Sequence, residues 1–125
     1  MLIPRDLKIV DKLAKLCEKN PVQLRCKHVA ALVSRNTIVS LGMNKAKSDP
    51  GFFELSKDRR KQYVHAEWDC LNGIENAHKY TMYVVRVDKN GQLANSKPCK
   101  ICQQAIDGAG IKRVVHSTNR GIAVL

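Results

Sequence analysis

The chain has 125 residues, of which 44% are hydrophobic and 26% charged, a composition typical of one folded globular domain that needs no disulfides. Lys and Arg number 22 against 11 Asp and Glu, so the net charge is +11, which favours anionic partners such as nucleotides or nucleic acid. No stretch approaches the roughly 18 apolar residues of a membrane span, and the five cysteines fit poorly with a paired disulfide framework. We therefore expect a single domain over residues 1–125, in the cytoplasm and without membrane contact.

Hydrophobic periodicity and turn residues predict the elements in chain order. Apolar residues at helical spacing predict a first helix over 6–19, which Asn20-Pro21 ends. Two β-like runs follow, separated by Asn36, and resemble a tight hairpin. The remaining expected segments are these: strands 28–35 and 37–43, a long polar loop 44–62, a helix 65–78, a strand 81–88, a short helix 99–110 and strands 112–118 and 121–125.

This order of helices and strands predicts an α/β protein, with a mixed sheet and helices on both of its faces. Only about three residues join the last two strands, which is enough for an antiparallel hairpin but too few for a parallel crossover. The last two strands are therefore expected to be antiparallel neighbours.

Two short motifs carry the chemistry, HAEWDC (65–70) and PCKIC (98–102). Cys99 and Cys102 stand three residues apart behind a proline, so they project from one side of the first turn of a helix. Two thiolates form half of a tetrahedral zinc site, and the imidazole of His65 can supply the third ligand, leaving a fourth position open for water. Glu67 lies two residues further on, where a carboxylate can take a proton from that water and return it to a leaving nitrogen.

Each motif alone has other interpretations. C-x-x-C also occurs in redox-active dithiols. A purely structural zinc site would need a fourth ligand, and the sequence offers Cys70, His78 and His116 for it.

Together, H-A-E (65–67) and P-C-K-I-C (98–102) resemble the signature of the zinc-dependent cytidine and deoxycytidylate deaminase superfamily. LGMNKAKSDP (41–50) and GIKRVVHST (110–118) resemble further segments of that family, so the resemblance covers most of residues 25–118. Small bacterial or phage deoxycytidylate-deaminase-like proteins are the most similar kind. The resemblance implies a three-layer α/β/α sandwich around a five-stranded mixed sheet, and hydrolytic attack at C4 of cytosine with release of ammonia.

Carried over residue by residue, the resemblance implies that His65, Cys99 and Cys102 bind Zn²⁺ and that Glu67 is catalytic. The backbone N–H of Ala66 would contact the base and Asn44 the sugar. Four basic residues in or after the long loop are candidates for contacts to a 5′-phosphate: Lys45, Lys47, Arg59 and Arg60.

The sequence combines features of different subfamilies of these deaminases. The antiparallel ending and C-Q-Q after Cys102 resemble the cytidine deaminases that act on free nucleosides, but those enzymes often have cysteine in place of His65. The expected reaction is conversion of a cytosine nucleotide or nucleoside, with dCMP the best single candidate, to the uracil form. Two alternatives are a polynucleotide deaminase acting on tRNA or single-stranded DNA and a non-catalytic zinc-stabilised binding module. The resemblance also implies a homo-oligomer. The expected cytoplasmic location would be the host cytoplasm if the chain is phage-encoded.

Overall fold

The computed structural model describes residues 2–18, 27–43, 45–48, 63–64, 66–88 and 90–125. The elements in chain order are α1 (Pro4–Glu18), β1 (Lys27–Ser34), β2 (Thr37–Met43), β3 (Lys45–Ser48), β4 (Tyr63–Val64), α3 (Ala66–Leu71), the 3-10 helix η2 (Ala77–Lys79), β5 (Thr81–Val87), β6 (Leu93–Ala94), α4 (Lys100–Gly108), β7 (Val114–Thr118) and β8 (Gly121–Val124). No helix in these described segments is long and apolar enough to cross a membrane.

The main sheet has the strand order β2-β1-β5-β7-β8, and the short strand β6 pairs with β5 as a sixth strand. Strands β5 and β7 are parallel, and α4 lies in the connection between them, whereas β1 pairs antiparallel with both β2 and β5. Strands β7 and β8 form an antiparallel hairpin, as the short connection predicts. The predicted mixed α/β fold is thus confirmed, with the two-residue strand β6 added to the five expected strands.

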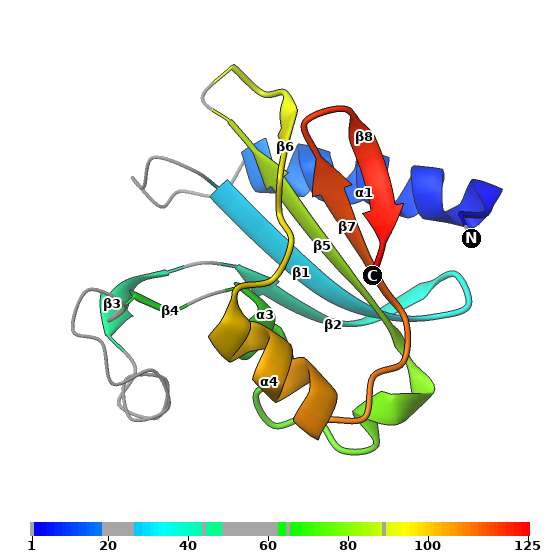
Figure 1. The fold of residues 1–125 in the computed structure, drawn as a ribbon, viewed down its shortest axis with the longest axis vertical. Helices are drawn as coiled ribbons and strands as arrows, with labels where there is room; N and C mark the ends of the chain where they lie inside the picture. Colours follow the sequence, from blue (N-terminus) through cyan, green and yellow to red (C-terminus); the bar gives the residue numbers. More distant parts are fainter. Residues whose placement is uncertain (1, 19–26, 44, 49–62, 65, 89) are drawn as a thin grey trace.

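The sheet separates two layers of helices (Figure 1). Side chains alternate between the faces of a strand, so Val29, Ala31 and Val33 of β1 pack with α1. Ala30 and Leu32 of the same strand pack on the opposite face, with residues of α3 and α4. Continuous apolar runs in β1 and β5 are therefore explained by burial on both faces.

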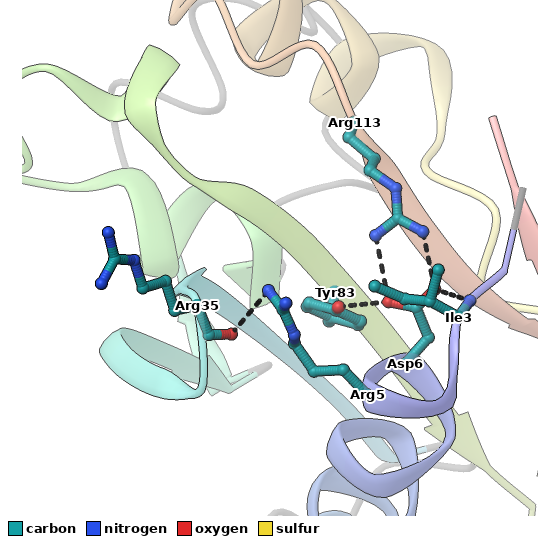
Figure 2. Close-up of polar contacts among 6 residues, drawn as sticks. All are labelled: Ile3, Arg5, Asp6, Arg35, Tyr83 and Arg113. Atoms are coloured by element: carbon teal, nitrogen blue, oxygen red, sulfur yellow. Dashed lines mark hydrogen bonds and ion pairs between the residues drawn. The ribbon is translucent and has the colours of Figure 1, made fainter.

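Helix α1 is held to the sheet by Asp6, whose side chain is fully buried (Figure 2). Arg113 donates to both carboxylate oxygens, at 3.0 Å from Nη1 and 2.6 Å from Nη2, and Tyr83 donates its hydroxyl. The backbone N–H of Ile3 adds a fourth donor at 2.9 Å. Burial alone raises the pKa of Asp6, but the hydrogen bonds from Arg113, Tyr83 and Ile3 outweigh it and lower the pKa to about 2.

Two sequence predictions are wrong in detail. The helix expected over 65–78 ends at Leu71, because Asn72-Gly73 forms a turn in which Gly73 has φ of 77°, the left-handed region that favours glycine. The polar sequence of 44–62 predicts a loop, but residues 45–48 form β3, which pairs with β4 as a separate two-stranded sheet. Residues 49–62 lie outside the described residues.

Candidate active site

Glu67 occupies the first turn of α3, and only 4% of its surface is exposed. A carboxylate at a helix N-terminus is favoured by the helix dipole and by N–H groups that have no partner within the helix. Burying it here removes it from bulk water, which is unusual for glutamate outside a site with a specific role.

Two hydrogen bonds fix α3 on the end of β2. The hydroxyl of Ser40 donates to the carbonyl oxygen of Cys70 at 2.7 Å, and the backbone N–H of Met43 donates to Asp69 Oδ2 at 3.2 Å. Strand β2 ends at Met43, so α3 is anchored where the strand stops. The position of Glu67 is thus set by β2 as well as by its own helix.

The two cysteines of PCKIC begin α4. Cys99 is the N-cap residue, with extended backbone (φ −67°, ψ 167°), and its carbonyl accepts the first helical hydrogen bond from the N–H of Gln103 at 2.8 Å. Cys102 lies in the first turn and is fully buried. The predicted start of this helix at the two cysteines is confirmed.

A pair of buried serines fixes the segment that leads into Cys99. Ser96 Oγ lies 2.7 Å from the carbonyl oxygen of Val84 on β5 and accepts the N–H of Ser117 on β7 at 2.9 Å. Ser117 Oγ lies 2.6 Å from the carbonyl oxygen of Ala94 and 2.8 Å from Ser96 Oγ. These contacts attach the entry to α4 to the two central parallel strands. Neither serine stands out in the sequence, because the contact joins residues 21 positions apart.

The first turns of α3 and α4 meet at the thiol of Cys102, which forms hydrogen bonds with the side chains of Cys99 and Glu67. The hydrogen bond with Cys99, burial and the negative charge of Glu67 all raise the pKa of Cys102. The two motifs, more than 30 positions apart, predict that these three residues belong to one site. The structure brings all three together.

The other predicted site residues are described less fully. His65, Asn44, Arg59 and Arg60 lie outside the described residues, whereas Lys45 and Lys47 belong to β3, which directly follows Asn44. Ala66, the first residue of α3, is fully buried beside Glu67. Among the described residues, no three His, Cys, Asp or Glu side chains form a metal-binding group. His65, the third expected ligand, lies outside the residues that were described and so could not be part of such a group.

Two of the alternative fourth ligands of a structural zinc site have other partners in the structure, and the third is exposed. Cys70 is buried against β2, with its sulfur 3.7 Å from the carbonyl oxygen of Ser40, and burial raises its pKa to about 11. His116 is buried in β7, with Nδ1 3.0 Å from the carbonyl oxygen of Ser117, and His78 is exposed. These residues therefore give no support to a closed four-ligand site.

A cavity of about 260 Å³ lies between the later parts of α3 and α4. Trp68 and Ala105 contribute to its lining, the first next to Glu67 and the second one turn beyond Cys102. Trp68 is partly exposed and borders an opening between the two helices.

The fold and the paired motifs at two helix starts define a deaminase. The chain belongs to the cytidine and deoxycytidylate deaminase family, because the model of that family's zinc-binding region matches residues 5–118. It is accordingly a hydrolytic deaminase of the nucleoside and nucleotide type, as the sequence motifs predict. No curated protein sequence matches the chain significantly.

Three solved structures are similar to this one. The cytidine deaminase of Burkholderia pseudomallei has a TM-score of 0.61 at 21% identity, over 99% of this chain and 92% of that one. The cytidine deaminase of Mycobacterium leprae has a TM-score of 0.57 at 19% identity, over 94% and 91%. The apo dCMP deaminase of cyanophage S-TIM5 has a TM-score of 0.56 at 17% identity, over 92% and 84%. At these identities the likeness concerns the fold.

Proposed function

We propose that this protein is a zinc-dependent deaminase that converts a cytosine nucleotide, with dCMP the best single candidate, to its uracil form and ammonia. The observation that carries this proposal is the contact of buried Glu67 with Cys102 at the meeting of two helix starts. A buried carboxylate beside two thiols has a use in proton transfer and none in a simple structural site.

The donor set fits zinc. Cys99 and Cys102 face one another at the start of α4, and a bound metal would displace their protons, because zinc binds cysteine as the thiolate. His65 directly precedes α3 and is the expected third ligand. When bound by three protein ligands, zinc lowers the pKa of water in its open position towards about 7 and so supplies a nucleophile at neutral pH.

The protein's own residues supply the proton transfers. Glu67 takes a proton from the attacking water and delivers it to the amino nitrogen at C4, which leaves as ammonia, so that cytosine and water become uracil and ammonia. The N–H of Ala66, in the first turn of α3, has no partner within the helix and is the group we expect to hydrogen-bond the base. Burial of Glu67 keeps bulk water from competing for its proton.

Basic residues close in sequence to the expected sugar contact support a substrate that carries a 5′-phosphate. We expect Asn44 to contact the sugar, and Lys45 and Lys47 follow it in the sequence. Arg59 and Arg60 complete the set of candidate phosphate contacts, within a chain of net charge +11. The cyanophage dCMP deaminase has also been solved in complex with dCMP and dUMP, with a TM-score of 0.53 to this chain.

A second candidate substrate is the free nucleoside. The antiparallel β7–β8 hairpin has the form that the sequence resemblance associates with cytidine deaminases. The TM-score is also higher for the Burkholderia pseudomallei cytidine deaminase than for the phage enzyme. The two candidates differ only in the need for a 5′-phosphate.

One assay separates these substrates. Zinc-loaded protein is given cytidine, deoxycytidine, CMP, dCMP and a cytosine-containing single-stranded oligonucleotide, and loss of the amino group is followed by ultraviolet absorbance, with Glu67→Ala as the blank. We expect dCMP to have the highest kcat/KM. Equal turnover of deoxycytidine and dCMP would favour the nucleoside, and turnover of the oligonucleotide alone would favour a polynucleotide deaminase. If no substrate is converted, the proposed function is wrong.

A further inference from the structure

Helix α1 presents a row of basic side chains to solvent. The row consists of four exposed residues: Arg5, Lys8, Lys12 and Lys15. Their spacing of three, four and three residues places them within an arc of about 80° on one flank of the helix. They extend over about 15 Å of helix length, since each residue adds about 1.5 Å.

Arg35, exposed in the turn between β1 and β2, extends this row at its N-terminal end. Arg5 Nη1 donates to the carbonyl oxygen of Arg35 at 3.3 Å, so the two residues lie side by side (Figure 2). We call these five residues the α1 basic face. Within the part of the chain that the structure describes, one ion pair touches this face, between Lys15 Nζ and Asp11 Oδ2 at 3.3 Å. Both side chains are about 70% exposed or more, so the pair is weak and open to competition by another anion.

We propose that the α1 basic face binds the phosphate backbone of nucleic acid. Phosphates of one duplex strand follow one another every 3.4 Å along the axis, so a row of about 15 Å spans about four of them. Exposed lysines can each replace the counterions condensed on such a backbone, which is the main source of affinity without sequence preference.

Two other classes of partner fit this face less well. A helix that binds a membrane surface inserts its apolar side, but the apolar side of α1 is already buried against the sheet through Val10, Leu13 and Cys17. The cores of protein interfaces are depleted in lysine and need apolar anchors, whereas lysine is the commonest residue of this face.

The α1 basic face is separate from the candidate active site. Helix α1 covers one face of the sheet, and α3 and α4 cover the other (Figure 1). Nucleic acid bound at α1 therefore does not present its bases to Glu67. The inference stands independently of the proposed reaction, because binding is measured on one side of the sheet and deamination on the other.

The test compares two triple variants that remove the same charge. Lys8→Gln/Lys12→Gln/Lys15→Gln neutralises the α1 basic face, and Lys79→Gln/Lys112→Gln/Arg120→Gln removes three exposed charges elsewhere. Arg5 is left in place because it hydrogen-bonds Arg35. Fluorescence anisotropy with a labelled oligothymidylate gives the affinity over a range of salt concentrations. Oligothymidylate is chosen because it has no amino group to lose by deamination. Binding to a duplex of random sequence and to phosphatidylserine–phosphatidylcholine vesicles is measured under the same conditions.

We expect the α1 variant to bind the oligothymidylate roughly tenfold more weakly than the wild type. The slope of log K against log salt should also become less steep by about 2, since each lost phosphate contact removes about 0.7. The control variant should bind as the wild type does, and both variants should keep the wild-type turnover of the monomeric substrate. Equal weakening in the two variants would overturn the proposal, as would binding to vesicles but to neither nucleic acid. No binding by the wild type at low salt would overturn it as well, whatever the deamination assay shows.

Discussion

Gly42 on β2 and Cys70 on α3 approach so closely that no side chain fits between them. A Cβ on Gly42 would lie 2.4 Å from the backbone nitrogen of Cys70 and 2.3 Å from the carbonyl oxygen of Ala66. Both contacts are with backbone, which cannot turn aside as a flexible side chain can. Because Ala66 and Cys70 flank Glu67 in the same short helix, Gly42 sets the distance between the sheet and the candidate catalytic carboxylate.

Replacement of Gly42 by alanine should therefore damage both stability and activity. We expect Gly42→Ala to lower the free energy of unfolding by about 1 to 3 kcal/mol, because the added methyl group pushes α3 off β2. Urea unfolding and kcat are measured together. The control is Gly108→Ala, since a Cβ there meets nothing within 4 Å and should change stability by less than about 1 kcal/mol. Equal stability of the two variants would mean that α3 adapts to the added methyl group.

Removal of the charge on Glu67 should abolish most of the turnover. In Glu67→Gln the amide has nearly the same shape but cannot accept and return a proton, so we expect kcat to fall by a factor of about 10² to 10⁴. Glu75→Gln, at an exposed carboxylate, is the matched control and should keep the wild-type kcat. Wild-type turnover by Glu67→Gln would remove Glu67 from the mechanism, and circular dichroism checks that both variants are folded.

The elements that carry the site could be predicted because their signals are local. Cys99 and Cys102 follow a proline and begin α4, and the apolar run 81–87 is β5. The end of α3 does not follow from the apolar pattern, because Ile74 and Ala77 continue that pattern beyond Asn72-Gly73, where the turn ends the helix.

The long-range polar contacts that hold the entry to α4 and helix α1 in place were not predictable from local patterns. Ser96 meets Ser117 across 21 residues, and Asp6 meets Arg113 across 107 residues. Hydrophobic periodicity identifies which face of a strand is buried, but it does not identify which polar groups are satisfied by one another inside the core. Gly42 gives a sequence signal only once α3 is known to cross β2.

Zinc binding should depend on the two cysteines of α4, Cys99 and Cys102, and not on Cys70. We expect dialysis against 1,10-phenanthroline to abolish deamination and added zinc to restore it. Cys99→Ser and Cys102→Ser should each lower the zinc content of the purified protein, measured by atomic emission. Cys70→Ala is the control, since that thiol is buried against Ser40 and should leave the zinc content unchanged. Wild-type zinc content in a Cys99→Ser/Cys102→Ser variant would contradict the proposed ligand set.

Stability at acid pH should depend on Asp6. The pKa of Asp6 is lowered from 3.8 to about 2 in the folded protein, and a lowered pKa stabilises the fold above the unfolded value. This lowering of the pKa corresponds to about 2 kcal/mol of stability, which is fully present above about pH 4 and lost as the pH falls through about 2. We therefore expect Asp6→Asn to be less stable than the wild type by about 2 kcal/mol at neutral pH, and this difference to shrink between pH 4 and pH 2.

Asp11→Asn is the matched control for Asp6→Asn on the same helix. Asp11 pairs with Lys15 in solvent, so its replacement should cost less than about 1 kcal/mol. Urea unfolding of the three proteins over a series of pH values gives both differences. If the Asp6→Asn difference stayed constant between pH 4 and pH 2, the contribution of Asp6 would come from packing and not from its charge, and Arg113 would not be its essential partner.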